Sequence, residues 1–331
     1  MPKLYIDEFV GITNRLETLP LAFAIRQAYG HEIILDWHEL DSFSVDDTRR
    51  GKVRLLARLG AMRIRNCDET IFASLKDKKI ILRSLNGPAD RLDPIYMEVA
   101  SRIHLNHTLA SAIRAMFAPV QNRPVVGVHI RHGDYVITDE SVYKITDAEW
   151  PAVPVWWYEK AMASIAAKQK DVCFFLSCTG DPAAYTTLHR NFDILTLDTT
   201  SPYTYKGPDH ESRVNPVADL FALACCPVIL ATPISGYSHW AANVLGSPST
   251  CIVPLPGATP NHPMKGLVKL YGSRLPRWRS AGREGSDDPF ASGQDYLPHS
   301  DKVGKKGSDT VKISDDLEGV DLTGSANTDW L

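Results

Sequence analysis

The sequence lacks an excess of positive charge, a long apolar run and an N-terminal targeting segment. Its formal net charge is −3 over 331 residues, which does not favour a nucleic acid as partner, because backbone phosphates are bound by clustered Lys and Arg. No apolar run reaches the roughly 18 residues of a membrane-spanning helix. Asp7 and Glu8 interrupt the apolar N-terminus, which is atypical of a signal peptide. We therefore expect a cytoplasmic protein with no integral membrane segment and no nucleic-acid partner.

Paired cysteine motifs are also missing. None of the six cysteines belongs to a CxxC pair, and no group of His and Cys has the spacing of a zinc site. The cysteines lie mostly in apolar segments, where free cysteine behaves as a small hydrophobic residue. We therefore predict buried, reduced thiols and neither a disulfide framework nor a zinc centre.

What the sequence does contain is an alternation of short strand-like segments and segments with helical spacing. The first half predicts strands at residues 4–9, 32–37 and 79–83, and a helix that Gly30 ends. The second half predicts strands at 125–131, 172–178, 193–198, 227–232 and 250–255, separated by helices at 155–168, 182–191, 216–224 and 237–245. Alternation of this kind predicts an α/β fold with mainly parallel sheets covered on both faces.

At 331 residues the chain suits two domains. A helix predicted at residues 97–117 is broken by the segment 118–124. We therefore expect two Rossmann-like domains, at 1–120 and 121–279, that face a central cleft. Residues 280–331 are polar and have few apolar side chains, so we predict a disordered tail. The basic passage at residues 49–54 is interpreted as a solvated face in preference to a binding patch.

Polar clusters follow predicted strands at four places, residues 11–15, 129–134, 179–182 and 235–240. The carboxyl ends of parallel strands meet at one edge of a sheet, where open α/β sheets bind ligands. Taken singly, each cluster has a plainer explanation. Asn14 suits a helix N-cap, Asp181 suits a turn, and Ser238 suits the first turn of a helix.

Together the clusters suit a diphosphate. Arg131 ends the apolar strand and offers a fork of donors to phosphate oxygens. The helix that begins near Tyr237 and Ser238 offers backbone N–H groups and the positive end of its dipole. The sequence contains no Asp-x-Asp, the pattern by which many sugar-nucleotide enzymes hold a divalent cation. We therefore predict that the diphosphate is held without a metal and without another cofactor.

Three segments in order resemble the core motifs of the superfamily of α1,2-, α1,6- and protein O-fucosyltransferases. They are residues 129–134, residues 219–230 and residues 235–242. The likeness is greatest to the bacterial nodulation-type α1,6 enzyme and to bacterial α1,2 enzymes, and the loop 11–16 is similar to the Gly-x-x-Asn-Arg-Leu loop of several members. The resemblance implies a GT-B fold and a metal-independent, inverting transfer of fucose from GDP-fucose, with the donor held by the second domain.

The resemblance also implies residue roles. Arg131 would be catalytic and bind the β-phosphate, His129 and Asp181 would contact the guanine, and Ser238 with its neighbouring amides would hold the diphosphate. The same motifs place further donor-binding residues at Asn14, Arg15, His132, Ser235, Tyr237 and His239. His132 and His239 depart from the residues of many members, which leaves the linkage and the donor sugar open.

An inverting transfer benefits from a base that takes the acceptor proton, and a carboxylate is the natural candidate. Asp134 stands first, either as this catalytic base or as a structural residue that fixes Arg131. Asp7, Glu8 and Glu140 remain alternatives.

The acceptor is the least defined partner. Trp37, Trp156 and Trp157 could stack on an acceptor sugar, although aromatic residues at such spacing belong more often to the core. We expect transfer to a glycan or glycoconjugate. The alternatives are a nucleotide-sugar-binding protein without turnover and a transferase that uses a different GDP-sugar. A serine hydrolase is disfavoured, because no Gly-x-Ser-x-Gly motif accompanies the serines.

Overall fold

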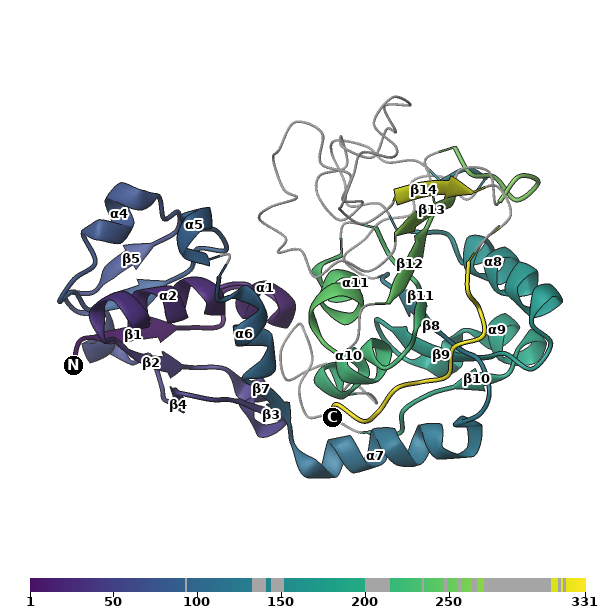
Figure 1. Cartoon of the computed structure of the whole chain (residues 1–331), viewed down its shortest axis with the longest axis horizontal. Coiled ribbons are helices and arrows are strands. Elements are labelled where there is room, and N and C mark those ends of the chain that lie inside the picture. Colours follow the sequence, from purple (N-terminus) through teal and green to yellow (C-terminus); the bar gives the residue numbers. More distant parts are fainter. Residues whose placement is uncertain are drawn as a thin grey trace. The chain divides into compact units, whose positions relative to one another are not determined.

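The structure is a computed structural model that describes residues 1–92, 94–132, 141–143, 152–199, 215–233, 235–246, 249–254, 257–263, 267–270, 311–314, 317 and 320–331 (Figure 1). The chain divides into two compact units at Asn106 and His107. This division falls ahead of the segment 118–124, where we expected it. The helix α7 (His107–Phe117) belongs to the second unit, because Phe117 packs edge to face on Phe175 with ring centroids 5.8 Å apart.

The first unit is built on a parallel five-stranded sheet in the order β4-β2-β1-β6-β5. The strands are β1 (Lys3–Ile6), β2 (Glu32–Leu35), β4 (Thr48–Arg50), β5 (Met62–Ile64) and β6 (Ile80–Leu82). The strands predicted at residues 4–9, 32–37 and 79–83 are thereby confirmed. The helix α2 (Leu19–Tyr29) ends at Gly30 as predicted, with the left-handed φ of 72° that glycine adopts without strain.

Shorter elements complete the first unit. The helices are α1 (Ile12–Leu16), η1 (His38–Asp41), α3 (Leu55–Arg58), α4 (Glu69–Ala73), α5 (Ala89–Leu92) and α6 (Tyr96–Ser101). The strand β3 (Phe43–Val45) pairs antiparallel with β7 (Ile103–Leu105). The single helix predicted at residues 97–117 is therefore wrong, because β7 separates α6 from α7. Ile103 fits the helical spacing of the residues that follow it, but Ile103 and Leu105 share a face only in a strand, and the pairing with β3 makes this segment a strand.

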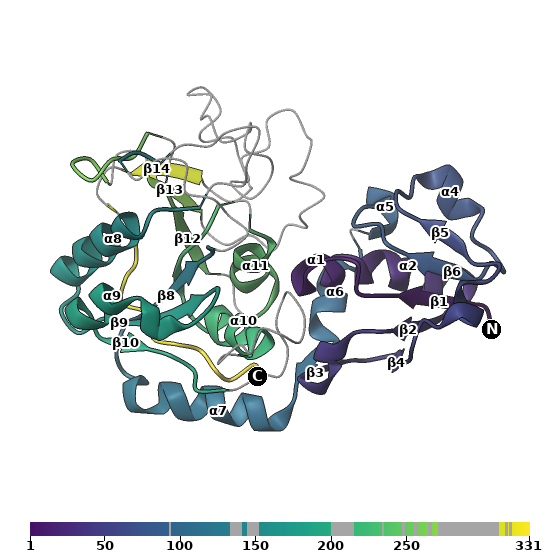
Figure 2. The same cartoon turned by 180° about the vertical axis from the view of Figure 1, so that it is seen from behind.

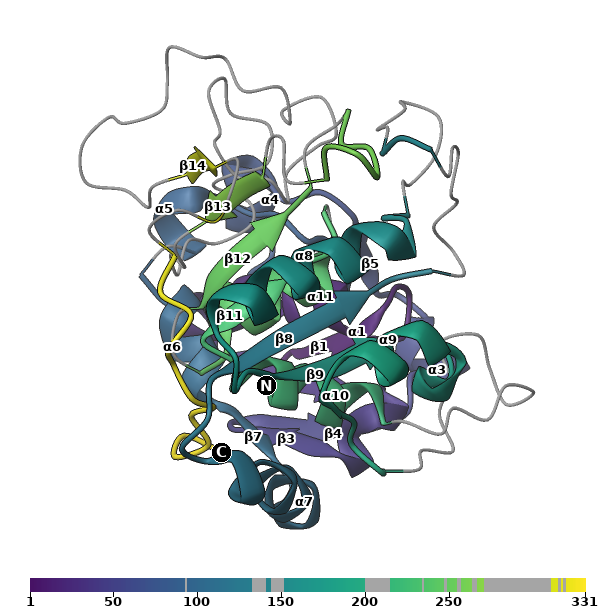
Figure 3. The same cartoon turned by 90° about the vertical axis from the view of Figure 1, so that its right-hand side faces the viewer.

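The second unit is built on a seven-stranded sheet in the order β10-β9-β8-β11-β12-β13-β14, in which β8 lies between β9 and β11 (Figure 3). The pairs from β10 to β12 are parallel, and β13 and β14 add antiparallel strands. The strands are β8 (Val125–Ile130), β9 (Cys173–Cys178), β10 (Ile194–Leu195), β11 (Val228–Leu230), β12 (Thr250–Val253), β13 (Leu267–Leu270) and β14 (Val311–Ser314). The helices besides α7 are η2 (Ala118–Val120), α8 (Val155–Lys168), η3 (Pro182–Ala184), α9 (Thr186–Asn191), α10 (Pro216–Ala224), α11 (Gly236–His239) and the π-helix η4 (Trp240–Val244).

Helices cover both faces of this sheet, α8 and α9 on one side and α10 and α11 on the other (Figures 1 and 2). Alternate residues of β8 serve the two faces. Val126 and Val128 join the core that includes Met162 of α8. Gly127 points the other way, where an added methyl group would lie 2.6 Å from Leu223 Cδ1 of α10. The glycine inside the predicted strand is therefore explained by the close approach of α10.

The C-terminal residues are part of the second unit, along which the yellow segment runs in Figure 2. Leu317 and Leu322 belong to the same core cluster as β8. The Val125 N–H, at the start of β8, donates to the Gly324 carbonyl at 3.0 Å. The predicted disordered tail is therefore wrong for the described residues 311–314, 317 and 320–331, because they supply a strand, core side chains and backbone hydrogen bonds.

The cysteines are all free, and all of them are buried except the partly buried Cys178. This confirms that the thiols are buried, as predicted. Among the described residues, no helix combines the length and the apolar character needed to cross a membrane.

Candidate functional site

The carboxyl ends of β8 and β11 are joined by hydrogen bonds. Thr232 donates from Oγ1 to the His129 carbonyl at 2.7 Å and accepts from the Arg131 N–H at 3.2 Å. Tyr158 of α8 donates to the same His129 carbonyl at 2.9 Å. The backbone that carries His129 and Arg131 is therefore fixed at the sheet edge where parallel sheets bind ligands.

The His129 imidazole is held by Ser238 of α11. Its Nδ1 lies 2.7 Å from Ser238 Oγ, which also accepts from the Thr232 N–H at 3.2 Å. Burial, and secondarily the charge of Arg131, lower the pKa of His129 to about 3, so the ring is neutral. Because the ring is neutral, one of these two groups donates to the other, and the tautomer of His129 sets which one.

Tyr237 covers the His129 ring. The two rings are stacked, with centroids 4.7 Å apart and planes inclined by 23°, and the Tyr237 hydroxyl donates to the Pro216 carbonyl at 2.7 Å. Burial, and secondarily the charge of Asp219, raise the pKa of Tyr237. Burial also raises the pKa of Asp219 to about 8, although a hydrogen bond from Ser177 opposes the shift. The side chains of Tyr237 and Asp219 are thus uncharged around neutral pH.

Arg131 and His132 directly follow β8 and are partly exposed. His132 Nε2 lies 3.0 Å from the Val153 carbonyl, and its Nδ1 lies 3.3 Å from the Tyr185 hydroxyl. A carbonyl only accepts, so Nε2 donates to Val153. Both ring nitrogens of His132 are therefore used within the protein, and its side chain supports the strand end.

The other predicted donor-binding residues of the second unit lie at or within short helices. Asp181 accepts from the Ala183 N–H at 3.0 Å and so caps η3, as its plainer explanation predicts. Ser235 is fully buried and directly precedes α11. His239 is buried within α11, and its Nδ1 lies 3.3 Å from Asn243 Nδ2. The structure thus brings His129, Tyr237 and Ser238 together and places Asp181 on an exposed turn.

Arg15 lies in the first unit and is buried. Its Nε donates to the Val10 carbonyl at 2.9 Å, its Nη1 donates to Glu39 Oε2 at 2.9 Å, and its Nη2 donates to Glu39 Oε1. Its guanidinium lies over the Trp37 ring, 5.2 Å from the centroid. These contacts link α1 to the loop before it and to η1. Asn14 is partly buried within α1, whose N-cap is Gly11, so the expectation that Asn14 is an N-cap is wrong.

Two of the three tryptophans that were considered for acceptor stacking belong to the core. Trp37 and Trp157 are 1% and 0% exposed, which excludes stacking of an acceptor sugar on them. Trp156 is partly exposed and packs against the core of the second unit. The expectation that aromatic residues at this spacing serve the core is therefore confirmed for Trp37 and Trp157.

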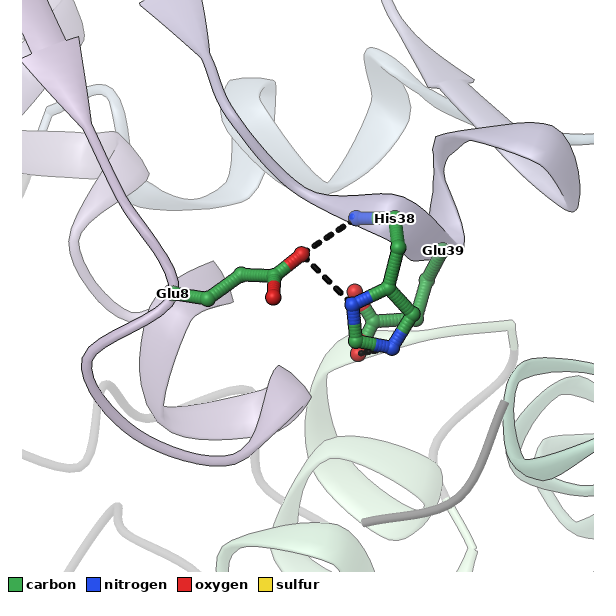
Figure 4. A group of neighbouring side chains, drawn as sticks. All are labelled: Glu8, His38 and Glu39. Carbon is green, nitrogen blue, oxygen red and sulfur yellow. Dashed lines mark hydrogen bonds and ion pairs between the residues drawn. The ribbon is translucent and has the colours of Figure 1, made fainter. Parts of the chain in front are cut away.

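The candidate bases in the first unit already have partners. Asp7 accepts from Arg83 Nε at 2.9 Å and from Arg83 Nη2 at 2.5 Å, and is buried. Glu8 accepts from the Nδ1 and the backbone N–H of His38 (Figure 4). The remaining candidates, Asp134 and Glu140, lie outside the described residues.

Glu8, His38 and Glu39 form a group whose ligand atoms lie within 4.8 Å of one another (Figure 4). This spacing could suit a metal ion. However, Glu39 is paired with the Arg15 guanidinium, and Glu8 Oε1 lies 2.6 Å from His38 Nδ1. A cation would have to displace these donors beside a buried positive charge, so the group does not fit a metal site.

Three residues of the network at the strand edge carried no prediction: Thr232, Tyr158 and Asp219. Thr232 lies two residues beyond β11, at the same sheet edge as Arg131, and its place at the end of a predicted strand was the signal that could have identified it. Tyr158 and Asp219 lie on predicted helices, and the helical spacing does not show which way a polar side chain points.

No protein-family model and no curated protein matches the sequence. Solved structures do match. NodZ alpha-1,6-fucosyltransferase co-crystallised with GDP has a TM-score of 0.50 and 14% identity, over 82% of this chain and 99% of that chain. A mutant of Arabidopsis thaliana FUT1 in complex with GDP has a TM-score of 0.52 and 9% identity, over 83% and 74%. Fucosyltransferase NodZ from Bradyrhizobium has a TM-score of 0.49 and 14% identity, over 76% and 96%.

The likeness to the first two structures is a likeness of fold. Parallel α/β sheets covered by helices were predicted from the alternation of segments, and the structure confirms them. The resemblance that residues 129–134, 219–230 and 235–242 indicate is likewise confirmed at the level of the fold.

Proposed function

We propose that this protein is a glycosyltransferase that transfers fucose from GDP-fucose to a glycan or glycoconjugate acceptor, inverts the anomeric centre and uses no metal. The observation that carries the proposal is the position of Arg131, which directly follows the buried strand β8 on a backbone fixed by Thr232. Two solved structures of similar fold were determined with GDP. The carboxyl end of β8 is the edge at which such a sheet binds its ligand.

In this proposal the protein's contribution is electrostatic. The acceptor oxygen forms a bond to C1 of fucose, the bond from C1 to the β-phosphate oxygen breaks, and its electron pair leaves with GDP. Arg131 neutralises the charge that grows on the β-phosphate. We assign the tautomer in which Ser238 donates to Nδ1, so that His129 presents an Nε2–H donor. Ser238 Oγ is used inside the protein, so the backbone amides of α11 are left to meet the diphosphate.

The donor can be identified by thermal shift with GDP, UDP, GDP-fucose and GDP-mannose. A ligand at 100 times its Kd stabilises a protein by about 2.7 kcal/mol, which is enough to rank the four compounds. We expect GDP and GDP-fucose to raise the Tm and UDP to leave it unchanged. The absence of a response to every guanine nucleotide would overturn the proposal, and a preference for GDP-mannose would replace fucose by another sugar.

The role of Arg131 is tested by Arg131→Ala, with Arg190→Ala as the matched control. Arg190 is exposed at the end of α9. Removing one donor aimed at developing charge costs about 10²- to 10³-fold in rate. We expect that loss in Arg131→Ala and none in the control, with both variants folded. Rates close to wild type in folded Arg131→Ala would contradict the assignment, and GDP-fucose binding without transfer to any acceptor would mark a binding protein.

The acceptor base is proposed to be Asp134. Its role is separated from a structural one by the pH–rate profile of Asp134→Asn. A base predicts loss of the acidic limb of the profile, whereas a residue that only fixes Arg131 predicts weaker donor binding with an unchanged profile.

A further inference from the structure

One segment of the first unit exposes most of its large apolar side chains. Leu55, Leu56 and Leu59 are 74%, 78% and 58% exposed, and Met62 is 37% exposed. Among the described residues, the other large apolar side chains with such exposure are Met1 and Val10. Clustered leucines are unusual on a monomer surface and mark a contact with another apolar body.

The fold explains why these leucines are not needed by the core. The segment crosses from the edge strand β4 to the opposite edge strand β5, and α3 forms a single turn in between. Val53, Ala57 and Ala61 pack against the sheet residues Tyr5 and Ile34. The small residues thus face the sheet, and the leucines between them face outward.

The same segment is strongly basic. Residues 48–66 contain no acidic residue and seven basic ones: Arg49, Arg50, Lys52, Arg54, Arg58, Arg63 and Arg65. Four of these have carboxylate partners elsewhere in the unit, at Glu32, Asp41, Asp36 and Asp7. Arg54, Arg63 and Arg65 are exposed and form no ion pair with a described residue. The interpretation of this passage as a merely solvated face therefore accounts for the paired cations and leaves three cations and three leucines unexplained.

We propose that the surface formed by Arg54, Leu55, Leu56, Leu59, Arg63 and Arg65, here called the basic leucine surface, binds an anionic lipid bilayer. Basic side chains are attracted to anionic headgroups, and leucines that enter the headgroup region add apolar burial. The inference does not depend on the proposed fucosyl transfer.

Other occupants fit this chemistry less well. A nucleic-acid backbone would use the arginines and leave the leucines exposed to water. A second copy docked through the same face would bring like charges together, because a two-fold interface is self-complementary. A bilayer satisfies both the charge and the leucines.

Vesicle co-sedimentation of the full chain tests the proposal. The probes are vesicles of phosphatidylcholine alone and of phosphatidylcholine with an equal part of phosphatidylglycerol. We expect binding to the anionic vesicles only. Substitution of Arg54, Arg63 and Arg65 by Gln should lower the partition coefficient roughly 100-fold, since each basic side chain near an anionic surface contributes about fivefold. The matched control replaces three exposed cations of the second unit by Gln, namely Lys160, Lys170 and Arg190. It should leave binding unchanged.

The leucines need a separate readout. The variant Leu56→Trp should show a blue shift of its added fluorescence with anionic vesicles, and substitution of Leu55, Leu56 and Leu59 by Gln should remove the binding that survives at high salt. Because these side chains are exposed, thermal unfolding should remain as in wild type. Three outcomes would each overturn the proposal. The first is an equal loss of vesicle binding in the variant of Arg54, Arg63 and Arg65 and in the second-unit control, and the second is the absence of a blue shift in Leu56→Trp. The third is binding of a single-stranded oligonucleotide that is tighter than binding of the vesicles and that the leucine variant retains.

Discussion

Ser238 Oγ lies 2.7 Å from His129 Nδ1, although the two residues are 109 positions apart in the sequence. The contact joins α11 to the penultimate residue of β8. It also sets which nitrogen of a neutral imidazole carries the proton. The position of one hydroxyl thus decides whether His129 offers a donor or an acceptor to a ligand.

Ser238→Ala should therefore cost both stability and ligand affinity. The change leaves the Thr232 N–H and His129 Nδ1 without their common partner. Leaving buried polar groups unsatisfied costs about 1–3 kcal/mol, which denaturant unfolding can measure. Ser101→Ala, which removes an exposed hydroxyl bonded to the Glu98 carbonyl, is the control and should cost much less. An unchanged free energy of unfolding in Ser238→Ala would show that the hydrogen bonds do not fix the ring.

Asp219→Asn should make the protein more stable at neutral pH. Burial raises the pKa of Asp219 from 3.8 in the unfolded chain to about 8 in the folded protein. Between these values the unfolded chain has lost a proton that the folded protein keeps, so stability falls as pH rises. Asn has the shape of Asp and cannot ionise. The gain in the free energy of unfolding should therefore grow as the pH rises from 3.8 to about 8, and it should vanish below pH 3.8. Measuring the free energy of unfolding against pH for both proteins checks this. Parallel curves would mean that the Asp219 carboxyl is not buried in its neutral form.

Gly127→Ala should destabilise the second unit, because the added methyl group would meet Leu223 and Cys226 of the α10 region. Overpacking of a core typically costs about 1–3 kcal/mol. The double variant with Leu223→Ala should show a coupling energy in a double-mutant cycle, since the smaller side chain makes room for the methyl group. Additive effects would place the strain of Gly127→Ala elsewhere.

Trp330→Ala should destabilise the second unit as well. The Trp330 ring stacks on Phe221 with centroids 5.5 Å apart, and its Nε1–H donates to the Asn327 carbonyl at 3.0 Å. Because Trp330 is partly exposed, we expect a loss of roughly 1–3 kcal/mol, below that of a fully buried aromatic residue. Trp330→Phe should retain much of the stability. A disordered tail would predict no change in either variant, and thermal unfolding separates the two.

The sequence allowed the parallel sheets to be predicted because their strands are short apolar runs, such as 125–131, flanked by helical spacing. It could not show the order of the strands or the pairing of β3 with β7. The C-terminal residues were missed for a compositional reason. The polar segment before them dominates the average composition of residues 280–331. That average conceals Leu317, Leu322 and Trp330, which pack against the second unit.

At the site, the sequence could identify which strand ends carry polar residues and could not show where their hydroxyls and rings point. Arg131 and His129 were predicted from their place after an apolar run. Ser238 was expected to face a ligand, and its hydroxyl is instead used by His129 and Thr232, a contact between distant segments that no local pattern encodes.

The bond between Val125 and Gly324 has a consequence for the order of folding. Val125, the first residue of β8, is synthesised long before Gly324, whose carbonyl accepts its N–H. Leu322 and Trp330 are likewise synthesised after most of the core residues of the second unit. Residues 1–106, the described part of the first unit, can fold while the rest of the chain is being made. The second unit must wait for its last residues and then close long loops, so we expect it to be the slower of the two to fold and the one whose unfinished core is exposed to aggregation.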